Sequence, residues 1–218
     1  MNNVKTYTYS IGGRDLTLRF GDLAFQAHGA VRAQYGETVV LATAVMGEPR
    51  EGMEYFPLTV DYEEKMYAAG RIKGSRFIKR EGRPTDEAVL TSRLIDRTIR
   101  PLFDQSIRQD VQIITNVLAF DQVNDPDIIS LCAASAAISV SSIPWDVPIA
   151  GVRVAQVAGK MIVNPTYEEI KQSQFEMTLS GKKHLTNMIE AAAKEASDAD
   201  LAEAMKVAEK EVAGLVDF

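Results

Sequence analysis

The first part of the chain alternates apolar and polar residues over short segments, which is the pattern of half-buried β-strands. Apolar side chains recur at every second position from Tyr7 to Ile11 and from Leu16 to Phe20, on either side of Gly12-Gly13. This arrangement predicts a β-hairpin with a glycine turn. Runs rich in β-branched or aromatic residues predict further strands over 30–33, 38–45, 56–62 and 111–120.

Two segments change from this alternation to helical spacing. Thr85 can cap a helix that runs to about Arg100 and is ended by Pro101. Asp125, followed by a proline at the first helical position, predicts a second helix over 127–140. Because its residues are small and apolar on every side, we expect this helix to be buried.

A second and smaller unit is predicted to begin after Ser141–Pro144. Ser197 can cap a final amphipathic helix, whose apolar positions run at helical spacing from Leu201 to Leu215. We therefore expect one compact α+β chain with a larger lobe over 1–143 and a smaller α/β lobe over 144–218. Strands of the smaller lobe are predicted over 152–156, 161–163, 175–179 and 188–190.

Composition places the chain among ordinary folded proteins. It has 218 residues, and no window approaches the ~18 uninterrupted apolar residues that cross a membrane. The first ten residues lack the basic-then-apolar order of a signal peptide, so we expect a cytoplasmic protein without membrane contact. Cys132 is the sole cysteine, which excludes an internal disulfide, and its apolar surroundings favour a small buried side chain.

Positive charge is concentrated between Arg71 and Arg100. This segment has nine basic residues against four acidic ones, a net charge of +5, so the rest of a chain with net charge −6 sums to −11. A local basic segment on an acidic protein indicates a site for a polyanion. The alternative is a solvated helix face with a charged loop.

The loop over 70–84 contains three glycines, five Lys or Arg residues after Ile72, and one aromatic residue, Phe77. Cations that neutralise phosphates and an aromatic ring on which a base can stack are what sequence-tolerant binding of a single strand requires. Phe77 between Arg76 and Lys79 meets both requirements. In the alternative interpretation, Phe77 packs under the loop as a local anchor.

The helix predicted after this loop has two distinct faces. Arg93, Arg97 and Arg100 are spaced by four and three residues and share one face, while Ile95 and Ile99 lie on the other with Ala88. Guanidinium groups bind phosphates through paired donors. The alternative is ordinary surface ion pairing, for which Asp96 lies close enough in the sequence.

Several of these segments closely resemble the first core of the polynucleotide phosphorylase family. The resemblance implies an RNase PH-like fold, a ribosomal protein S5 domain 2-like βαβα core with a smaller α/β lobe. It further implies two such cores in each subunit and a ring-shaped homotrimer with RNA in a central channel. The segments that carry it are 56–62, 67–72, 80–84, 93–97 and 99–103, with looser similarity over 124–138, 164–166 and 179–181.

The same resemblance assigns RNA-binding residues. In that family, phenylalanines and arginines line the channel entrance, and the matching segment here is Arg76–Arg80. The arginines of the following helix match family arginines that lie toward the RNA path and the active site of the neighbouring core. The residues expected to bind RNA are Phe77, Lys79, Arg80, Arg83, Arg93, Arg97 and Arg100.

The catalytic pattern of the family is missing from this chain. The active core uses a serine-rich phosphate loop, and two aspartates plus a lysine that hold Mg²⁺ and the reacting phosphate. Here the segment over 123–127, in the place of that loop, contains no serine. Ile170 stands where the family has the first aspartate, and Thr178 replaces the lysine. Glu176 alone cannot clamp a metal against a phosphate. We therefore expect no catalytic and no metal-ligating residue in this segment.

The resemblance implies a phosphate-dependent 3′–5′ exoribonuclease, a polyribonucleotide nucleotidyltransferase acting in mRNA turnover. This segment would guide RNA and be inactive alone, with Mg²⁺ bound by a second core and inorganic phosphate as co-substrate. The second core and the KH and S1 modules are not found in these residues. Expected partners are single-stranded RNA rather than DNA, two further subunits and an RNA-degradation assembly. The alternatives are a stand-alone RNase PH-type tRNA-processing enzyme and a non-catalytic scaffold.

Overall fold

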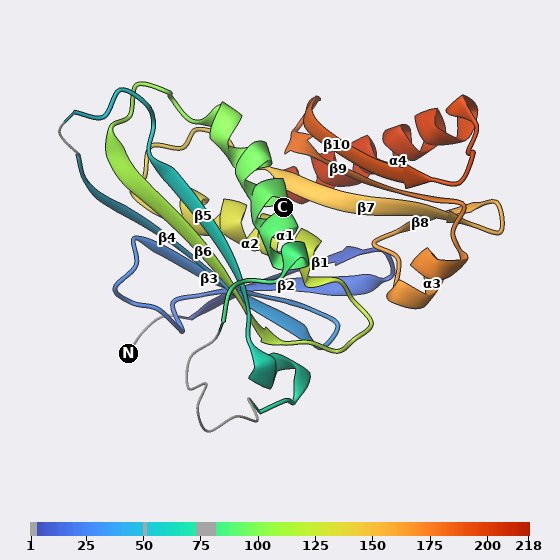
Figure 1. The fold of residues 1–218 in the computed structure, drawn as a ribbon, viewed down its shortest axis with the longest axis horizontal. Coiled ribbons are helices and arrows are strands. Elements are labelled where there is room, and N and C mark those ends of the chain that lie inside the picture. Colours follow the sequence, from blue (N-terminus) through green and yellow to red (C-terminus); the bar gives the residue numbers. More distant parts are fainter. Residues whose placement is uncertain (1–3, 50–51, 73–81) are drawn as a thin grey trace.

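A computed structural model describes residues 4–49, 52–72 and 82–218, and this part of the chain forms two sheets with helices around and between them (Figure 1). The six-stranded sheet has the order β1-β2-β3-β4-β6-β5, and the four-stranded sheet has the order β10-β9-β7-β8. The strands are β1 (Lys5–Ile11), β2 (Arg14–Phe20), β3 (Gly29–Tyr35), β4 (Thr38–Pro49), β5 (Leu58–Glu64), β6 (Gln109–Ala119), β7 (Ala150–Val157), β8 (Lys160–Val163), β9 (Phe175–Lys182) and β10 (Leu185–Ala193).

One pair of neighbouring strands is parallel, and a helix connects its two strands. Strand β5 runs parallel to β6, whereas the other neighbouring strands pair antiparallel. A parallel pair needs a crossover connection, and α1 supplies it. The helices are η1 (Met66–Ala69), α1 (Asp86–Ile99), η2 (Arg100–Leu102), α2 (Pro126–Ser139), α3 (Tyr167–Gln172) and α4 (Asp198–Asp217).

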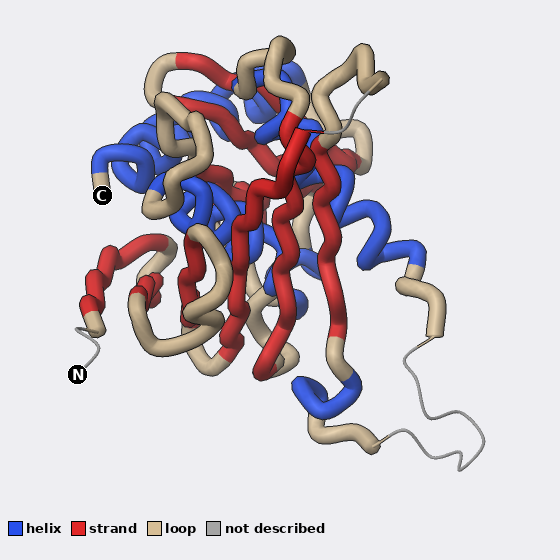
Figure 2. Tube along the Cα trace, turned by 90° about the vertical axis from the view of Figure 1, so that its left-hand side faces the viewer, coloured by secondary structure: helices blue, strands red, loops and turns tan. Residues whose placement is uncertain are grey.

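Helices α1 and α2 lie between the two sheets. Helix α2 packs on β3 and β4 and also touches β7, and the Thr98 and Ser180 hydroxyls, from α1 and β9, lie 2.8 Å apart. Helix α4 covers the opposite face of the four-stranded sheet, where Gln156 donates a hydrogen bond to Asp200 at 3.0 Å. Figure 2 shows the six-stranded sheet with the helices packed behind it.

The core is continuous across both sheets. Helix α2 is buried along almost its whole length, as its uniformly apolar sequence predicts. Gly29 of β3 allows the close approach, because a Cβ atom there would lie 1.9 Å from the Ala137 carbonyl oxygen. No helix in the described part of the chain combines the length and apolar character that spanning a bilayer requires.

The sequence-based elements are largely confirmed. The N-terminal hairpin has the predicted turn, and Thr85, Asp125 and Ser197 cap the three long helices. Helix α3 was not predicted. It has only six residues and begins at a capping box in which the Thr166 hydroxyl accepts from the Glu169 backbone N–H, while the Glu169 carboxylate accepts from the Thr166 N–H.

Candidate nucleic-acid interface

Local packing determines which face of α1 points into the core. The Thr85 hydroxyl oxygen accepts a hydrogen bond from the Ala88 N–H at 3.0 Å, which starts the helix. Ala88, Ile95 and Ile99 are buried, and the helix packs along β5. The apolar face predicted from helical spacing is therefore the inward face, and the opposite face is left to solvent.

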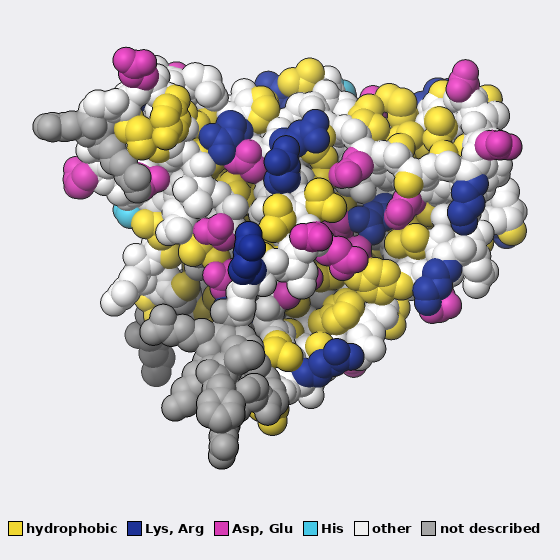
Figure 3. Space-filling model, in the orientation of Figure 1, with side chains coloured by type: hydrophobic (Ala, Val, Ile, Leu, Met, Phe, Trp, Pro, Cys, Tyr) yellow, Lys and Arg dark blue, Asp and Glu magenta, His cyan; other side chains and the backbone are white. Residues whose placement is uncertain are grey.

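Arg93 and Arg97 lie on this outward face, one helical turn apart. Both side chains are exposed, and within the described ranges neither has a hydrogen-bond or ion-pair partner. Figure 3 shows basic side chains gathered over α1. Two exposed guanidiniums with unused donors at adjacent turns can hold phosphate oxygens.

Arg100, the third arginine predicted for this face, is engaged within the chain. Its Nε donates to Asp96 Oδ2 at 3.0 Å, and its Nη2 donates to Asp96 Oδ1 and to the Leu58 carbonyl oxygen at 3.0 Å. Asp96 thus pairs with one of the arginines, as its position in the sequence allows. The Arg100 side chain nevertheless remains 39% exposed.

Arg83 is exposed and stands two residues before the cap of α1. Phe77, Lys79 and Arg80 lie outside the described residues. Four of the seven predicted RNA-binding residues therefore lie in the described part of the chain: Arg83 before α1, Arg93 and Arg97 on it, and Arg100 at its C-terminal cap.

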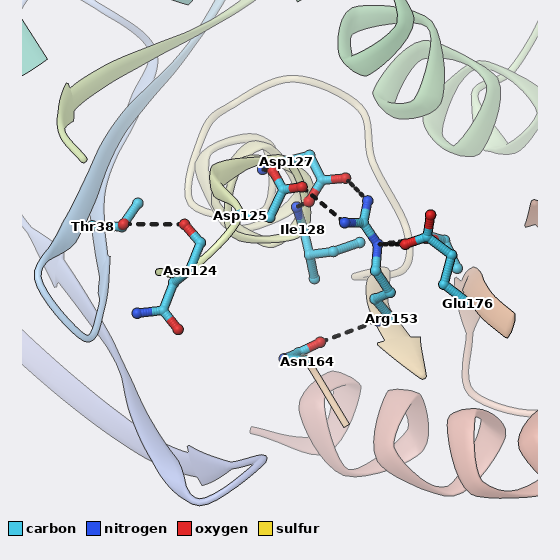
Figure 4. A network of polar contacts seen from close by, with 9 residues as sticks. Thr38, Asn124, Asp125, Asp127, Ile128, Arg153, Asn164 and Glu176 are labelled. Carbon is cyan, nitrogen blue, oxygen red and sulfur yellow. Dashed lines mark hydrogen bonds and ion pairs between the residues drawn. The ribbon is translucent and has the colours of Figure 1, made fainter. Parts of the chain in front are cut away.

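A second polar centre lies where the family pattern predicts phosphate and metal chemistry. Arg153 of β7 points to the N-terminal end of α2, where Nη1 pairs with Asp125 at 2.8 Å and Nη2 pairs with Asp127 (Figure 4). Its Nε donates to the Thr178 hydroxyl at 3.3 Å and lies 3.8 Å from the Glu176 carboxylate. One guanidinium thus stands among three carboxylates.

This arrangement does not fit a resident Mg²⁺ ion. Magnesium requires near-octahedral oxygen ligands and keeps several waters. Here a cationic guanidinium occupies the space among Asp125, Asp127 and Glu176, and Thr178 stands beside it. In the described ranges, no group of three or more His, Cys, Asp or Glu side chains is arranged to hold a metal.

Sequence reasoning missed the role of Arg153. A signal was present, because Arg153 is the single charged residue in a strand whose neighbours Val152 and Val154 are fully buried. A charge in such a position has to be paired, since the cost of burying it alone is several kcal/mol. The sequence did not show which acids pair with it.

The pKa of Asp127 gives the Arg153 centre a pH dependence. Burial raises the pKa of this carboxyl to about 7; Arg153 opposes that rise, and the nearby Asp125 adds to it. Burial also acts to lower the pKa of Arg153, but Asp127 and Asp125 raise it overall, so the guanidinium stays charged. Asp127 is therefore the titrating member of the pair.

Replacement of Asp127 by asparagine should change how stability varies with pH. A carboxyl whose pKa is raised in the folded state binds its proton more tightly there, so stability falls as pH rises from about 4 to about 7. The slope from this group is at most about 1.4 kcal/mol per pH unit. Asp127→Asn lacks this loss. Urea unfolding should therefore show that the free energy of unfolding of Asp127→Asn, minus that of wild type, increases as pH rises over that range. Glu203→Gln, on the exposed side of α4, is the control, and parallel profiles for Asp127→Asn and wild type would contradict the assignment.

Two family models match consecutive parts of this chain. Residues 12–144 match the model described as 3′ exoribonuclease family, domain 1, and residues 147–211 match domain 2 of the same family. The chain belongs to the 3′ exoribonuclease family. The predicted RNA-binding arginines lie in the part of the chain that matches domain 1, and Arg153 lies in the part that matches domain 2.

Relatives of high identity are polyribonucleotide nucleotidyltransferases. The chain is 50% identical to that of Staphylococcus aureus over 215 residues, 48% to that of Exiguobacterium sibiricum over 214, and 47% to that of Heliobacterium modesticaldum over 216. These matches cover 98–99% of this chain but 29–30% of each relative, so the chain spans about 30% of the relatives' length. The resemblance to the first core of polynucleotide phosphorylase is confirmed.

Solved structures with low sequence identity share the fold. Rice Rrp46 superposes with a TM-score of 0.72 at 15% identity, covering 100% of this chain and 93% of that one. The Archaeoglobus fulgidus exosome, solved with RNA bound to the active site, gives a TM-score of 0.68 at 17% identity, covering 97% and 85%. The predicted RNase PH-like fold is therefore confirmed.

Proposed function

We propose that this chain is the RNA-guiding first core of a phosphate-dependent 3′–5′ exoribonuclease. The observation that carries this proposal is the pair of exposed guanidiniums of Arg93 and Arg97, which have no partner among the described residues, in a chain about half identical to polyribonucleotide nucleotidyltransferases. The basic segment over 71–100 extends the positive charge toward the residues that precede α1. Phosphate contacts of this kind give affinity without sequence preference.

In the proposed reaction, an oxygen of inorganic phosphate attacks the phosphorus of the 3′-terminal phosphodiester. The bond to the 3′ oxygen of the preceding nucleotide breaks, and the terminal residue leaves as a nucleoside diphosphate. Catalysis of such a transfer is mainly positioning and charge stabilisation. We assign Mg²⁺ and the reacting phosphate to a second core, because Arg153 fills the corresponding space here. The role of this chain is to hold the single strand.

The proposal also covers the lobes of the chain, the oligomeric state of the parent protein, its location and its assembly. We propose lobes over 1–143 and 144–218, a homotrimeric parent protein, a cytoplasmic location and participation in an RNA-degradation assembly. The two family models, which meet between residues 144 and 147, support the division into lobes. The other parts of the proposal rest on the resemblance to the polynucleotide phosphorylase family, to which the names of the relatives point. No observation favours a stand-alone tRNA-processing enzyme.

A fluorescence titration with single-stranded RNA at two salt concentrations tests the guiding role. Arg80→Ala with Arg83→Ala, and separately Arg93→Ala with Arg97→Ala, should weaken binding. If each arginine contacts one phosphate, each pair should lower the log-log salt slope by about 1.4, since a single-strand contact contributes about 0.7.

The matched control is Lys171→Ala with Lys206→Ala. These lysines pair with Glu168 and Glu203 on α3 and α4, and their removal changes net charge by the same amount. We expect the control to bind RNA like wild type. Equal binding by all four proteins would leave the basic segment without a role and would favour the scaffold interpretation.

A further inference from the structure

Lys182, the last residue of β9, is a basic residue that is not among those predicted to bind RNA. It lies in the part of the chain that matches domain 2, whereas the predicted RNA-binding residues lie in the part that matches domain 1. Its side chain is half-buried, and within the described ranges its ammonium group has neither a hydrogen-bond nor an ion-pair partner. The three N–H donors of this group are therefore available to an anion.

The alternation of β9 places Lys182 on the face of the four-stranded sheet that packs on α1 and α2. Every second side chain of a strand points to the same face, so Lys182 shares its face with Ser180 and Thr178. The Thr178 hydroxyl accepts a hydrogen bond from Arg153 at 3.3 Å, in the centre at the start of α2. The Ser180 hydroxyl lies 2.8 Å from the Thr98 hydroxyl of α1. Lys182 is therefore the next side chain in a row that leads from α2 to α1.

Lys183 shows that the alternation continues to the end of the strand. Its Nζ donates to both carboxylate oxygens of Asp217 at 2.7 Å. Asp217 belongs to α4, and this helix covers the opposite face of the four-stranded sheet. The two adjacent lysines therefore point to opposite sides of the sheet. Lys183 is paired with an acid of α4, whereas Lys182 faces the side of α1.

Arg97 is the exposed arginine of α1 that lies toward this row. At 100° per residue, it stands between Arg93, on the outward face, and Thr98, which meets the four-stranded sheet. The Thr98 carbonyl oxygen accepts a hydrogen bond from Asn187 Nδ2 of β10 at 2.6 Å, so the smaller lobe touches α1 at this turn. Figure 1 shows the ends of β9 and β10 next to the C-terminal half of α1, and Figure 3 shows basic side chains over the same region.

We propose that Lys182 binds a phosphate of the single-stranded RNA together with Arg97, so that the cationic surface of α1 continues onto the smaller lobe. This inference rests on the proposed function, because it gives the guided strand a path across both lobes. Asp96, next to Arg97 in the sequence, is engaged by Arg100 and does not pair with either cation. An ammonium group binds phosphate as a point charge, so this contact adds affinity without sequence preference.

Titrations with single-stranded RNA over a range of salt concentrations test this contact in Lys182→Ala and Lys183→Ala. The two substitutions remove the same charge from adjacent positions, but only the first removes it from the side of α1. Lys182→Ala should weaken binding severalfold at low salt and lower the log-log salt slope by about 0.7, the contribution of one single-strand phosphate contact. Lys183→Ala should keep the wild-type slope. Lys182→Arg should keep it as well, because it retains the charge.

A wild-type slope for Lys182→Ala would overturn the proposal. An equal loss of slope in Lys183→Ala would overturn it too, because the effect would then come from net charge alone, and a loss in Lys182→Arg would show that the side chain acts through packing. The guiding role is tested separately. If Arg93→Ala with Arg97→Ala weakens binding while Lys182→Ala does not, only the Lys182 contact is wrong. If none of these variants changes binding, both proposals are wrong.

Discussion

Replacement of Arg153 by methionine should lower the free energy of unfolding by about 3–5 kcal/mol, the range measured when one partner of a buried ion pair is removed. The reason is that Asp125 and Asp127 at the N-terminal end of α2 would lose the cation between them, so buried Asp127 would have to bind a proton or stay an unpaired charge. Asp127 is almost fully buried, so water cannot replace the guanidinium. Urea unfolding of wild type and Arg153→Met at pH 7 measures the difference.

Two variants separate this electrostatic effect from a general loss of packing. Arg93→Met makes the same chemical change on the exposed face of α1 and should alter stability by less than about 0.5 kcal/mol. Arg153→Met combined with Asp127→Asn removes the buried carboxyl that has lost its cation and should recover part of the loss. A loss below about 1 kcal/mol for Arg153→Met would contradict the prediction, because it would mean that water solvates the two carboxyl groups once the guanidinium is removed.

The largest functional effect should appear in phosphorolysis. The 218-residue chain, supplied with single-stranded RNA, inorganic phosphate and Mg²⁺, should release nucleoside diphosphates at least about a thousandfold more slowly than the full-length protein. A metal and its bound phosphate contribute several kcal/mol of transition-state stabilisation, and about 4 kcal/mol corresponds to a factor of a thousand. Quantifying the nucleoside diphosphates released over time gives the two rates.

The control for this prediction is Glu176→Gln in the full-length protein. Glu176 stands at the position expected for a metal-holding carboxylate, but its nearest cation is Arg153, at 3.8 Å. We expect the full-length variant to keep its phosphorolysis rate within about twofold, since this side chain holds no reacting group. Phosphate-dependent release by the isolated chain, abolished by Glu176→Gln, would establish an active site here and refute the guiding role.

The Arg153 centre also has a structural role. Arg153 supplies, from inside the chain, a cation that pairs with Asp125 and Asp127 at the N-terminal end of α2. The same contacts join α2, which packs on the six-stranded sheet, to strands of the four-stranded sheet. We expect substitutions at Arg153 to affect stability rather than RNA affinity.

The sequence by itself determined the features that depend on near neighbours. Alternation and a glycine pair predicted the N-terminal hairpin, capping residues predicted the starts of the long helices, and helical spacing predicted the buried face of α1. Spacing also placed Arg93 and Arg97 on one exposed face. These features follow from periods of two and 3.6 residues and from local hydrogen bonds, which a sequence displays directly.

Only the tertiary structure decided which distant groups meet. Arg153 is 28 residues from Asp125 and 26 from Asp127, and Arg100 reaches a carbonyl oxygen 42 residues away. The Thr98 and Ser180 hydroxyls, 82 residues apart in the sequence, likewise meet only because separate segments pack together. Such contacts are set by how sheets and helices stack to bury apolar surface, and no local pattern encodes the resulting distances. The exposed arginines could therefore be predicted, whereas the guanidinium among the carboxylates could not.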